Sequence, residues 1–189
     1  FRFSLWEDFL GRGGRLDDLI TDHPPRALTR LAALCAQSPG ALVMDTAAAA
    51  LRGALLDPRV GGLVRSGVCV LNLGNMHTVA FLVAAGAVQA ILEHHTVLLT
   101  PAKLRDLVER FLAGELANQE VLDDQGHGVA RCEGAPRRRD LPVFVTGPRR
   151  ALAEGLPWPV AIPHGDVMLA GCFGLLTAAW EWVGQPPGA

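Results

Sequence analysis

The sequence predicts an α/β domain built on a mixed sheet, with helices on both faces of that sheet. Segments of strand character and of helix character alternate along the chain, and half of the residues are hydrophobic whereas only 19% are charged. A chain of 189 residues with this composition can bury a substantial core. We therefore expect one main globular domain with at most a small appendage.

The main domain is expected at residues 41–183, between an N-terminal segment and a short tail at 184–189. The chain begins at Phe1 rather than at a methionine, which indicates a piece of a longer protein. Residues 1–40 combine helical spacing of apolar side chains with several glycines. They are expected to form a helical segment or a linker from a missing N-terminal half.

In the first half of the chain, apolar spacing and capping residues predict the elements. Asp45 and Thr46 suit the N-terminus of an alanine-rich helix, and β-branched runs separated by short turns predict three successive strands. The expected elements are a helix at 26–36 that a proline pair opens, a short strand at 41–44, a helix at 45–56, and strands at 67–73, 78–84 and 87–92.

In the second half, Thr100 followed by Pro101 is typical of a helix N-cap with a proline in the first turn. Residues 123–141 are rich in Gly, Arg and Pro and are expected to form a loop. The remaining expected elements are a helix at 101–113, a short helix at 117–122, a strand at 143–146, a short helix at 148–154, a strand at 159–162 and a helix at 166–182.

Charge, apolar runs and cysteines exclude several classes of function. A net charge of −2 gives no general attraction to nucleic acid or to a membrane surface, and the longest apolar stretch, 167–180, is too short to span a bilayer. The four cysteines are widely spaced without a C-x-x-C pair, which indicates neither a zinc ribbon nor an iron–sulfur cluster. Three of them lie in apolar runs and are expected as buried thiols of a reduced, cytoplasmic protein.

The most informative segment is the strand–turn–strand at 68–83. A β-branched apolar run ends at a polar residue, a tight polar turn follows, and a second apolar run begins at Val79. Such a turn presents backbone N–H groups and small hydroxyls to a phosphate group. The residues expected to contact phosphate are Asn72, Gly74, Asn75, His77 and Thr78.

The order of the segments resembles the C-terminal half of the actin-like ATPase superfamily, which includes Hsp70-type chaperones and sugar kinases. Residues 45–55 are similar to its first connecting helix, 72–78 to its phosphate motif, 145–148 to its nucleotide motif and 170–179 to its closing helix. The resemblance implies a ribonuclease H-like fold, with ATP and Mg²⁺ as cofactors and Gly147 on the base or ribose side. Asn72 stands where the superfamily usually has an aspartate near Mg²⁺, and an amide is the poorer ligand for that ion.

A closer resemblance, over roughly residues 40–180, is to an uncharacterised prokaryotic family labelled as related to pyruvate formate-lyase activating enzyme. The matching pieces are the segments 72–78, 93–96, 123–128 and 163–166. The label implies radical chemistry, which needs three clustered cysteines for an iron–sulfur cluster. The sequence has no such group of cysteines, and we therefore expect no iron–sulfur cluster.

Five of the six histidines fall in these pieces, together with several acidic residues. Imidazoles and carboxylates can build a zinc or iron site or a general acid–base pair, although none of the local spacings is a known metal motif. The alternative is that each histidine caps a turn or satisfies a buried polar group. We expect the four pieces to converge on one cleft, with His77, His127 and Asp166 within roughly ten ångströms of one another.

Three functions remain open, and the sequence does not decide whether the chain is an enzyme. The first is binding of a phosphorylated small molecule by an actin-like ATPase or kinase-type domain, the second a metal- or histidine-dependent hydrolase or transferase, and the third a non-catalytic binding module. Trp180 and Trp182 are expected in the core or at a subunit surface, which leaves a homodimer open. The expected catalytic residues are His127, Asp124 and Asp166; the expected phosphate- or nucleotide-binding residues are Asn72, Gly74, Asn75, His77, Thr78 and Gly147; and the other expected site residues are Glu93, His94, His95, Gly126, Gly128 and His164.

Overall fold

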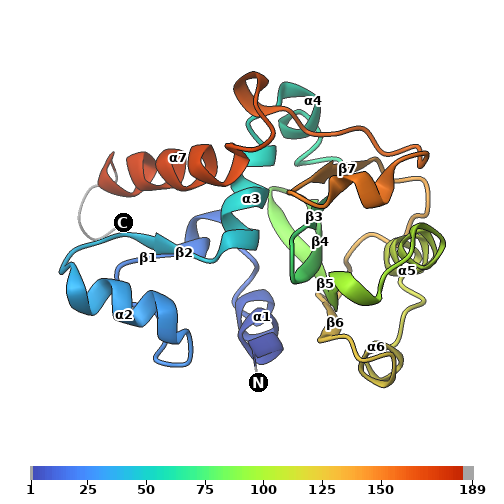
Figure 1. The fold of residues 1–189 in the computed structure, drawn as a ribbon, viewed down its shortest axis with the longest axis horizontal. Coiled ribbons are helices and arrows are strands. Elements are labelled where there is room, and N and C mark those ends of the chain that lie inside the picture. The colour runs from blue at the N-terminus through green and yellow to red at the C-terminus, as the bar shows by residue number, and fades with distance from the viewer. Residues whose placement is uncertain (1, 185–189) are drawn as a thin grey trace.

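A five-stranded mixed sheet lies at the centre of the main domain (Figure 1). The protein is described here from a computed structural model, which covers residues 2–184. The strand order is β6-β5-β4-β3-β7, and neighbouring strands are antiparallel except for the parallel pair β3 and β7. The strands are β3 (Val68–Leu73), β4 (His77–Ala84), β5 (Ala87–His95), β6 (Gly128–Arg131) and β7 (Val143–Thr146).

The central strands are apolar on both sides because both faces of the sheet are covered. Along β3, Val68 and Val70 enter one core cluster, whereas Cys69 and Leu71 enter the other. The same alternation runs along β4 and β5, since successive side chains of a strand point to opposite faces. The register of the sheet therefore assigns every polar residue at the strand ends to one face or the other.

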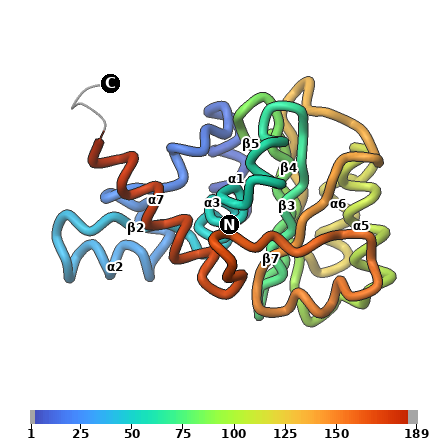
Figure 2. Tube along the Cα trace, turned by 90° about the horizontal axis from the view of Figure 1, so that it is seen from above, coloured from blue at the N-terminus to red at the C-terminus, as the bar shows by residue number. Residues whose placement is uncertain are grey.

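Helices from both ends of the chain cover the first face, and helices from its middle cover the second (Figure 2). The first face packs against α1 (Arg2–Gly11), α3 (Thr46–Ala54), α4 (Pro58–Gly61) and α7 (Ala170–Gly184). The second packs against α5 (Pro101–Ala113) and α6 (Asn118–Asp123). None of the helices within residues 2–184 is long and apolar enough to cross a membrane.

A smaller unit lies at the end of the molecule away from α5 and α6 (Figures 1 and 2). It pairs β1 (Ile20–Thr21) with β2 (Val43–Met44) in an antiparallel ribbon and includes α2 (Thr29–Gln37), which contains no fully buried residue. Short 3₁₀ turns lie at Leu16–Leu19, Thr96–Leu98, Arg150–Ala153 and Pro163–Gly165.

Helices α3 and α7 pack backbone against backbone. A methyl group added at Gly53 would lie 1.7 Å from the Ala170 carbonyl oxygen, and one at Gly174 would lie 2.0 Å from that of Ala49. Only glycine fits at these two positions. At Gly171, in contrast, the nearest neighbour of an added methyl group would be 4.0 Å away.

The three-strand meander, α3 and α5 agree with the sequence prediction, and so do their caps. The Asp45 carboxylate accepts a hydrogen bond from the Ala47 N–H at 2.9 Å, and the Thr100 hydroxyl accepts one from the Lys103 N–H at 3.3 Å. A mixed α/β fold with helices on both faces of the sheet is thereby confirmed.

Several boundaries differ from the prediction. Part of the expected loop 123–141 is strand β6, a short and half-exposed edge strand. The glycines on its N-terminal side made this segment resemble a loop in the sequence. The expected strand 159–162 is reduced to a single bridge between Val145 and Val160, in a segment with a proline before and after it. The last helix begins at Ala170 rather than at residue 166.

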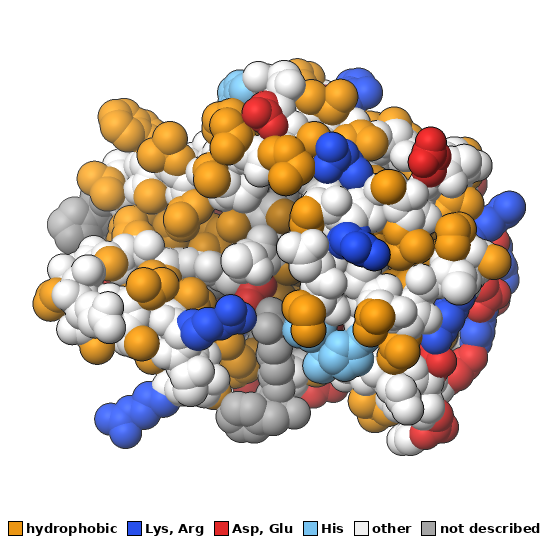
Figure 3. Space-filling model, viewed as in Figure 1, with side chains coloured by type: hydrophobic (Ala, Val, Ile, Leu, Met, Phe, Trp, Pro, Cys, Tyr) orange, Lys and Arg blue, Asp and Glu red, His pale blue; other side chains and the backbone are white. Residues whose placement is uncertain are grey.

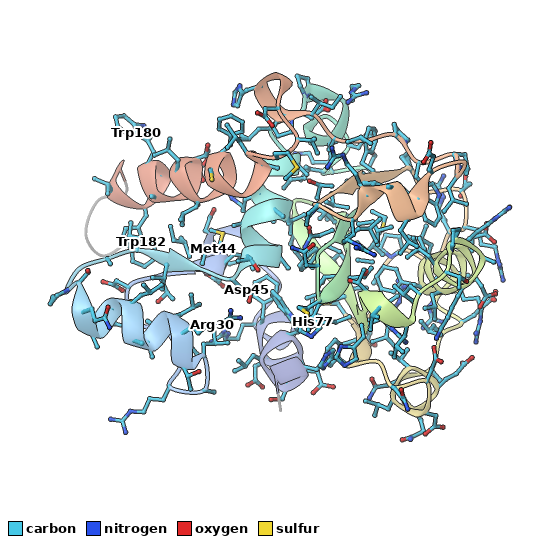
Figure 4. All side chains as sticks on the ribbon, viewed as in Figure 1. Arg30, Met44, Asp45, His77, Trp180 and Trp182 are labelled. Atoms are coloured by element: carbon cyan, nitrogen blue, oxygen red, sulfur yellow. The ribbon has the colours of Figure 1, made fainter. Side chains whose placement is uncertain are left out.

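In the N-terminal segment, helix α1 packs against β5 and β6; Gly11 ends the helix, and Gly13 and Gly14 follow it. The tail expected at 184–189 lies almost wholly outside the described residues. Of the cysteines, only Cys69 is fully buried and Cys172 is exposed, so the expectation of three buried thiols is wrong. Trp180 is 81% exposed on the outer side of α7 (Figure 4).

Candidate functional site

Polar residues gather at one end of the sheet and on one of its faces. The register aligns Thr146 of β7 with Asn72 of β3, Asn72 with Val79, Val79 with Glu93 of β5, and Glu93 with Gly128 of β6. This row runs across all five strands on the face that packs against α1 and α3. The end of the sheet at which β3, β5 and β7 finish is therefore the candidate site.

The turn between β3 and β4 is fixed by a backbone hydrogen bond and by Thr96, which directly follows β5. The Gly74 N–H donates to the His77 carbonyl at 3.0 Å, and the Thr96 hydroxyl donates to the Gly74 carbonyl at 2.8 Å. The Thr78 and Thr96 hydroxyl oxygens are 3.0 Å apart, and Thr78 is buried. Thr78 therefore stabilises the turn, whereas the other four residues predicted to contact phosphate line a cleft.

That cleft has a volume of about 470 Å³ and lies between the sheet end, α3 and α7. Within the described residues, its lining contains one arginine, Arg30, and no carboxylate. Figure 4 shows Arg30 and His77 on either side of Asp45, which caps α3. The cleft is lined by Arg30, Thr46, Ala47, Ala50, Asn72, Gly74, Asn75, Met76, His77, Val79, Thr146, Gly147, Pro148, Val167, Met168, Ala170 and Gly171.

Thr146 and Gly147 form the wall of the cleft at β7. The Thr146 hydroxyl is fully buried and has no hydrogen-bond partner among the described residues. Gly147 has a φ of +100°, and a side chain there would lie 2.5 Å from the Leu73 carbonyl oxygen and 2.8 Å from the Asn72 amide oxygen. A glycine is required at this position by both conformation and contact.

Three histidines from three segments meet beside the cleft. His77 begins β4, His95 ends β5 directly opposite it, and His127 immediately precedes β6. One ring nitrogen from each of the three lies within 4.8 Å of the others, and the ring centroids are 4.5–5.2 Å apart. We call these residues the three-histidine cluster. Histidine side chains reach the surface near the lower centre of the face in Figure 3, where Figure 4 labels His77.

A buried carboxylate lies behind this cluster. Glu93 is fully buried, its Oε1 is 4.0 Å from His77 Nδ1, and its Oε2 accepts a hydrogen bond from the Trp6 indole N–H at 3.0 Å. Trp6 is held on α1 by edge-on packing against Phe81 and Phe9. Helix α1 therefore positions the carboxylate that faces the cluster.

His94 belongs to a separate network on the opposite face of the sheet. It is 1% exposed, and its Nε2 is 3.0 Å from Asp124 Oδ2, while the Lys103 ammonium lies 2.7 Å from the same carboxylate. The Lys103 hydrogen bond, with a smaller contribution from His94, lowers the pKa of Asp124 below its usual range. Asp124, expected to be catalytic, thus holds a buried histidine, and the adjacent Gly126 contacts that ring.

The fourth predicted piece, 163–166, contributes least. The Asp166 carboxylate accepts hydrogen bonds from the Met168 and Leu169 N–H groups, and the exposed His164 packs against Phe173 with ring centroids 5.0 Å apart. Neither residue lines the cleft, although Val167 and Met168 do. The structure therefore brings His77 and His127 together, with ring centroids 4.7 Å apart, whereas the Asp166 carboxylate binds the backbone of the segment that follows it.

A family model described as "Putative pyruvate format-lyase activating enzyme (DUF1786)" matches residues 1–152, most of the chain. The chain belongs to this family. The match begins at residue 1 and therefore includes α1 and the β1–β2 ribbon, which lie before the segment of roughly residues 40–180 that carries the sequence resemblance. No curated protein matches the chain.

The family description implies an iron–sulfur cluster, and the residues of this DUF1786 chain do not fit one. Cys69 is in β3, Cys35 in α2, Cys132 follows β6 and Cys172 is in α7. Burial raises the pKa of the Cys69 thiol to about 12, which opposes the thiolate form that iron requires. Among residues 2–184, the only group of three or more metal-binding side chains is the three-histidine cluster.

Sequence reasoning missed three residues of this site. Trp6 could have been found from its helical spacing with Phe9 and Leu10, which would have indicated a packed helix. Thr146 carried a signal, since it ends a buried strand and precedes a glycine. Arg30 carried none, because its place at the cleft depends on how the β1–β2 unit packs.

Proposed function

We propose that the chain binds a phosphorylated small molecule in the cleft at the sheet end, as an actin-like, ribonuclease H-like domain would. One observation carries this proposal: the cleft is lined by all four segments that resemble the actin-like superfamily, although they are spread over more than 120 residues of the sequence. Separate segments that meet at the ends of the strands are typical of a ligand site in an α/β fold.

The charge and donors of the lining suit an anion. Arg30 supplies the only formal charge among the described lining residues. The amide of Asn72 and the buried Thr146 hydroxyl add neutral donors.

The superfamily resemblance implies ATP with Mg²⁺, and the cleft suits only the first of these. Mg²⁺ is held in proteins by carboxylate and water oxygens, whereas the described lining has no carboxylate and has Asn72 at the expected position. These residues do not fit a protein-held Mg²⁺. We therefore propose that the phosphate group is recognised by Arg30 and by neutral donors.

Calorimetric titration of the full chain with inorganic phosphate, pyrophosphate and ATP, each with and without Mg²⁺, tests the proposal. We expect Arg30→Ala to weaken binding about tenfold, the loss expected for one charge-assisted contact. Arg26→Ala is the matched control, because Arg26 is exposed and outside the cleft. No heat at millimolar ligand, or an equal loss in both variants, would contradict phosphate binding in this cleft.

A non-catalytic module is the second candidate, favoured by the amide at Asn72. Replacing Asn72 with Asp places a negative charge beside the proposed phosphate, and we expect binding to weaken without any ATP hydrolysis. A gain of hydrolysis in this variant, measured as phosphate release, would instead favour a nucleotide-hydrolysing ancestor site.

A further inference from the structure

We propose that His77, His95 and His127 bind one divalent transition-metal ion, with Zn²⁺ the best match to their chemistry. Neutral imidazoles are common ligands of Zn²⁺ and of other first-row transition metals, and three of them with an open fourth position form a frequent type of catalytic metal site. The three-histidine cluster supplies one nitrogen from each ring within a 4.8 Å span.

The fold fixes these rings before any ion arrives. His77 and His95 are directly opposite each other in the antiparallel pair β4–β5, so both side chains leave the same face of the sheet. The backbone N–H of His127 donates to the Glu93 carbonyl at 3.0 Å, which anchors the third histidine to β5. The three ligands thus come from three strand ends that are joined by sheet hydrogen bonds.

The spacing needs only a small contraction. Zinc–nitrogen bonds of about 2.0–2.1 Å place the nitrogens of a tetrahedral site roughly 3.4 Å apart. Rotation of half-buried rings about their side-chain bonds can close the present separation without moving the strands. The cluster is therefore of a size that one ion can draw together.

Glu93 completes the arrangement as a positioning residue. A carboxylate behind a metal-bound histidine accepts its second ring N–H, fixes the ring and raises the basicity of the ligand nitrogen. Glu93 Oε1 lies 4.0 Å from His77 Nδ1, and Trp6 fixes the other carboxylate oxygen. This separation is longer than a hydrogen bond, so the His77 ring would have to move toward Glu93 as the ion binds; a hydrogen bond from Nδ1 to Glu93 would then leave Nε2 of His77 for the metal.

The three-histidine cluster adjoins the cleft, because His77 belongs to both. The described lining of the cleft has no carboxylate for a hard cation such as Mg²⁺. A transition-metal ion held by the three imidazoles would lie beside the cleft and would have softer ligands. That a phosphoryl oxygen takes the open position rests on the proposed function, whereas the metal site itself does not.

The test is titration of the untagged, metal-free full chain with Co²⁺, followed by visible absorption, and with Zn²⁺, followed by calorimetry. We expect one ion per chain, a cobalt spectrum of four-coordinate type, and displacement of Co²⁺ by Zn²⁺. His95→Ala and His127→Ala should each weaken binding at least about a hundredfold, and Glu93→Gln about ten- to a hundredfold with the same stoichiometry.

His164→Ala is the matched control, because His164 is exposed and outside the cluster. It should change the affinity for the metal by less than about twofold, within the range of an independent site. Equal losses in His164→Ala and His95→Ala, or the absence of any stoichiometric ion, would overturn the proposal. If the cluster variants do not fold, X-ray absorption of the zinc-loaded unmodified chain decides: a first shell with fewer than three imidazoles would also overturn it.

Arg30→Ala separates the metal site from the phosphate site. It should leave Co²⁺ binding unchanged while weakening phosphate, since Arg30 lines the cleft and is not one of the cluster residues. Metal binding without phosphate binding would then contradict only the proposed function, and the reverse would contradict only the metal site.

Discussion

Two adjacent histidines at the end of β5 have opposite surroundings. His94 points to the α5–α6 face, where it is 1% exposed and paired with Asp124, which also binds Lys103. His95 points to the α1–α3 face, where it is half-buried among two other imidazoles. The same residue type thus serves a closed structural network on one face and an open cluster beside a cleft on the other, and strand alternation alone makes the difference.

The largest loss of stability is expected when His94 is removed from its network with Asp124 and Lys103. His94→Ala should lower the free energy of unfolding by about 3 kcal/mol, because it leaves a cavity at a buried ring and removes its partly buried hydrogen bond to Asp124. His95→Ala should cost less than about 1 kcal/mol in the metal-free chain, as expected for a half-exposed residue. Urea unfolding of both variants without metal measures the difference. Equal losses would show that the two faces do not differ in the way described.

The second largest loss of stability is expected at Gly126, in the loop before β6. A methyl group at Gly126 would lie 2.6 Å from both the His94 ring and the Val121 side chain. Gly126→Ala should therefore cost about 2 kcal/mol by overpacking. Gly11→Ala is the control, because nothing lies within 4 Å of that position, and it should change stability by less than about 1 kcal/mol. Thermal and urea unfolding measure both.

A third variant tests the support of the open cluster. Trp6→Phe removes the N–H that donates to the buried Glu93 carboxylate while keeping most of the aromatic packing. We expect a loss of about 1.5 kcal/mol, which is typical of a hydrogen bond to a charged group. Trp158→Phe makes the same chemical change at a half-buried tryptophan in the other core cluster. If the two variants cost the same in urea unfolding, the hydrogen bond to Glu93 contributes nothing.

The smallest effect concerns pH and the closed network. The folded pKa of Asp124 is below its unfolded value, so the stability from its ion pair is present above about pH 4 and is lost as pH falls below that range. Asp124 and Lys103 are both partly exposed, so Lys103→Met should cost only about 0.5 kcal/mol at pH 7.

This difference between Lys103→Met and the unmodified chain should shrink toward zero in acid, as urea unfolding from pH 7 to pH 3 would show. Arg105→Met is the control, since Arg105 forms an exposed pair with Glu109 on the same helix. A cost for Lys103→Met that stays constant with pH would contradict the assigned cause.

The sheet meander and the capped helices could be predicted because their signals are local. The runs at β3 and β4, the Asp45 cap and the Thr100–Pro101 start each lie within a few residues of the element they specify. Strand β6 could not be predicted from the sequence, because an edge strand of four residues has little apolar pattern and is stabilised by pairing with β5.

The site was predictable in part for the same reason. His77 was predicted from the turn after β3 and His127 from the piece 123–128 within the expected loop, and the structure brings them together. The separation of His94 from His95 required β5 to continue to residue 95, three residues beyond the strand end that the sequence predicts. Arg30 and Trp6 reach the site through packing of the N-terminal segment, a long-range arrangement that no local pattern encodes.

The glycine contact between α3 and α7 sets the width of the cleft. Since backbone touches backbone at Gly53 and Gly174, no side chain can yield to let the helices approach further. The two walls of the cleft that carry Ala47 and Ala170 are therefore held at a fixed spacing. We therefore expect the spacing of the two helices to limit the thickness of a ligand. Substitutions in the surrounding loops should change which chemical groups are recognised without changing that limit.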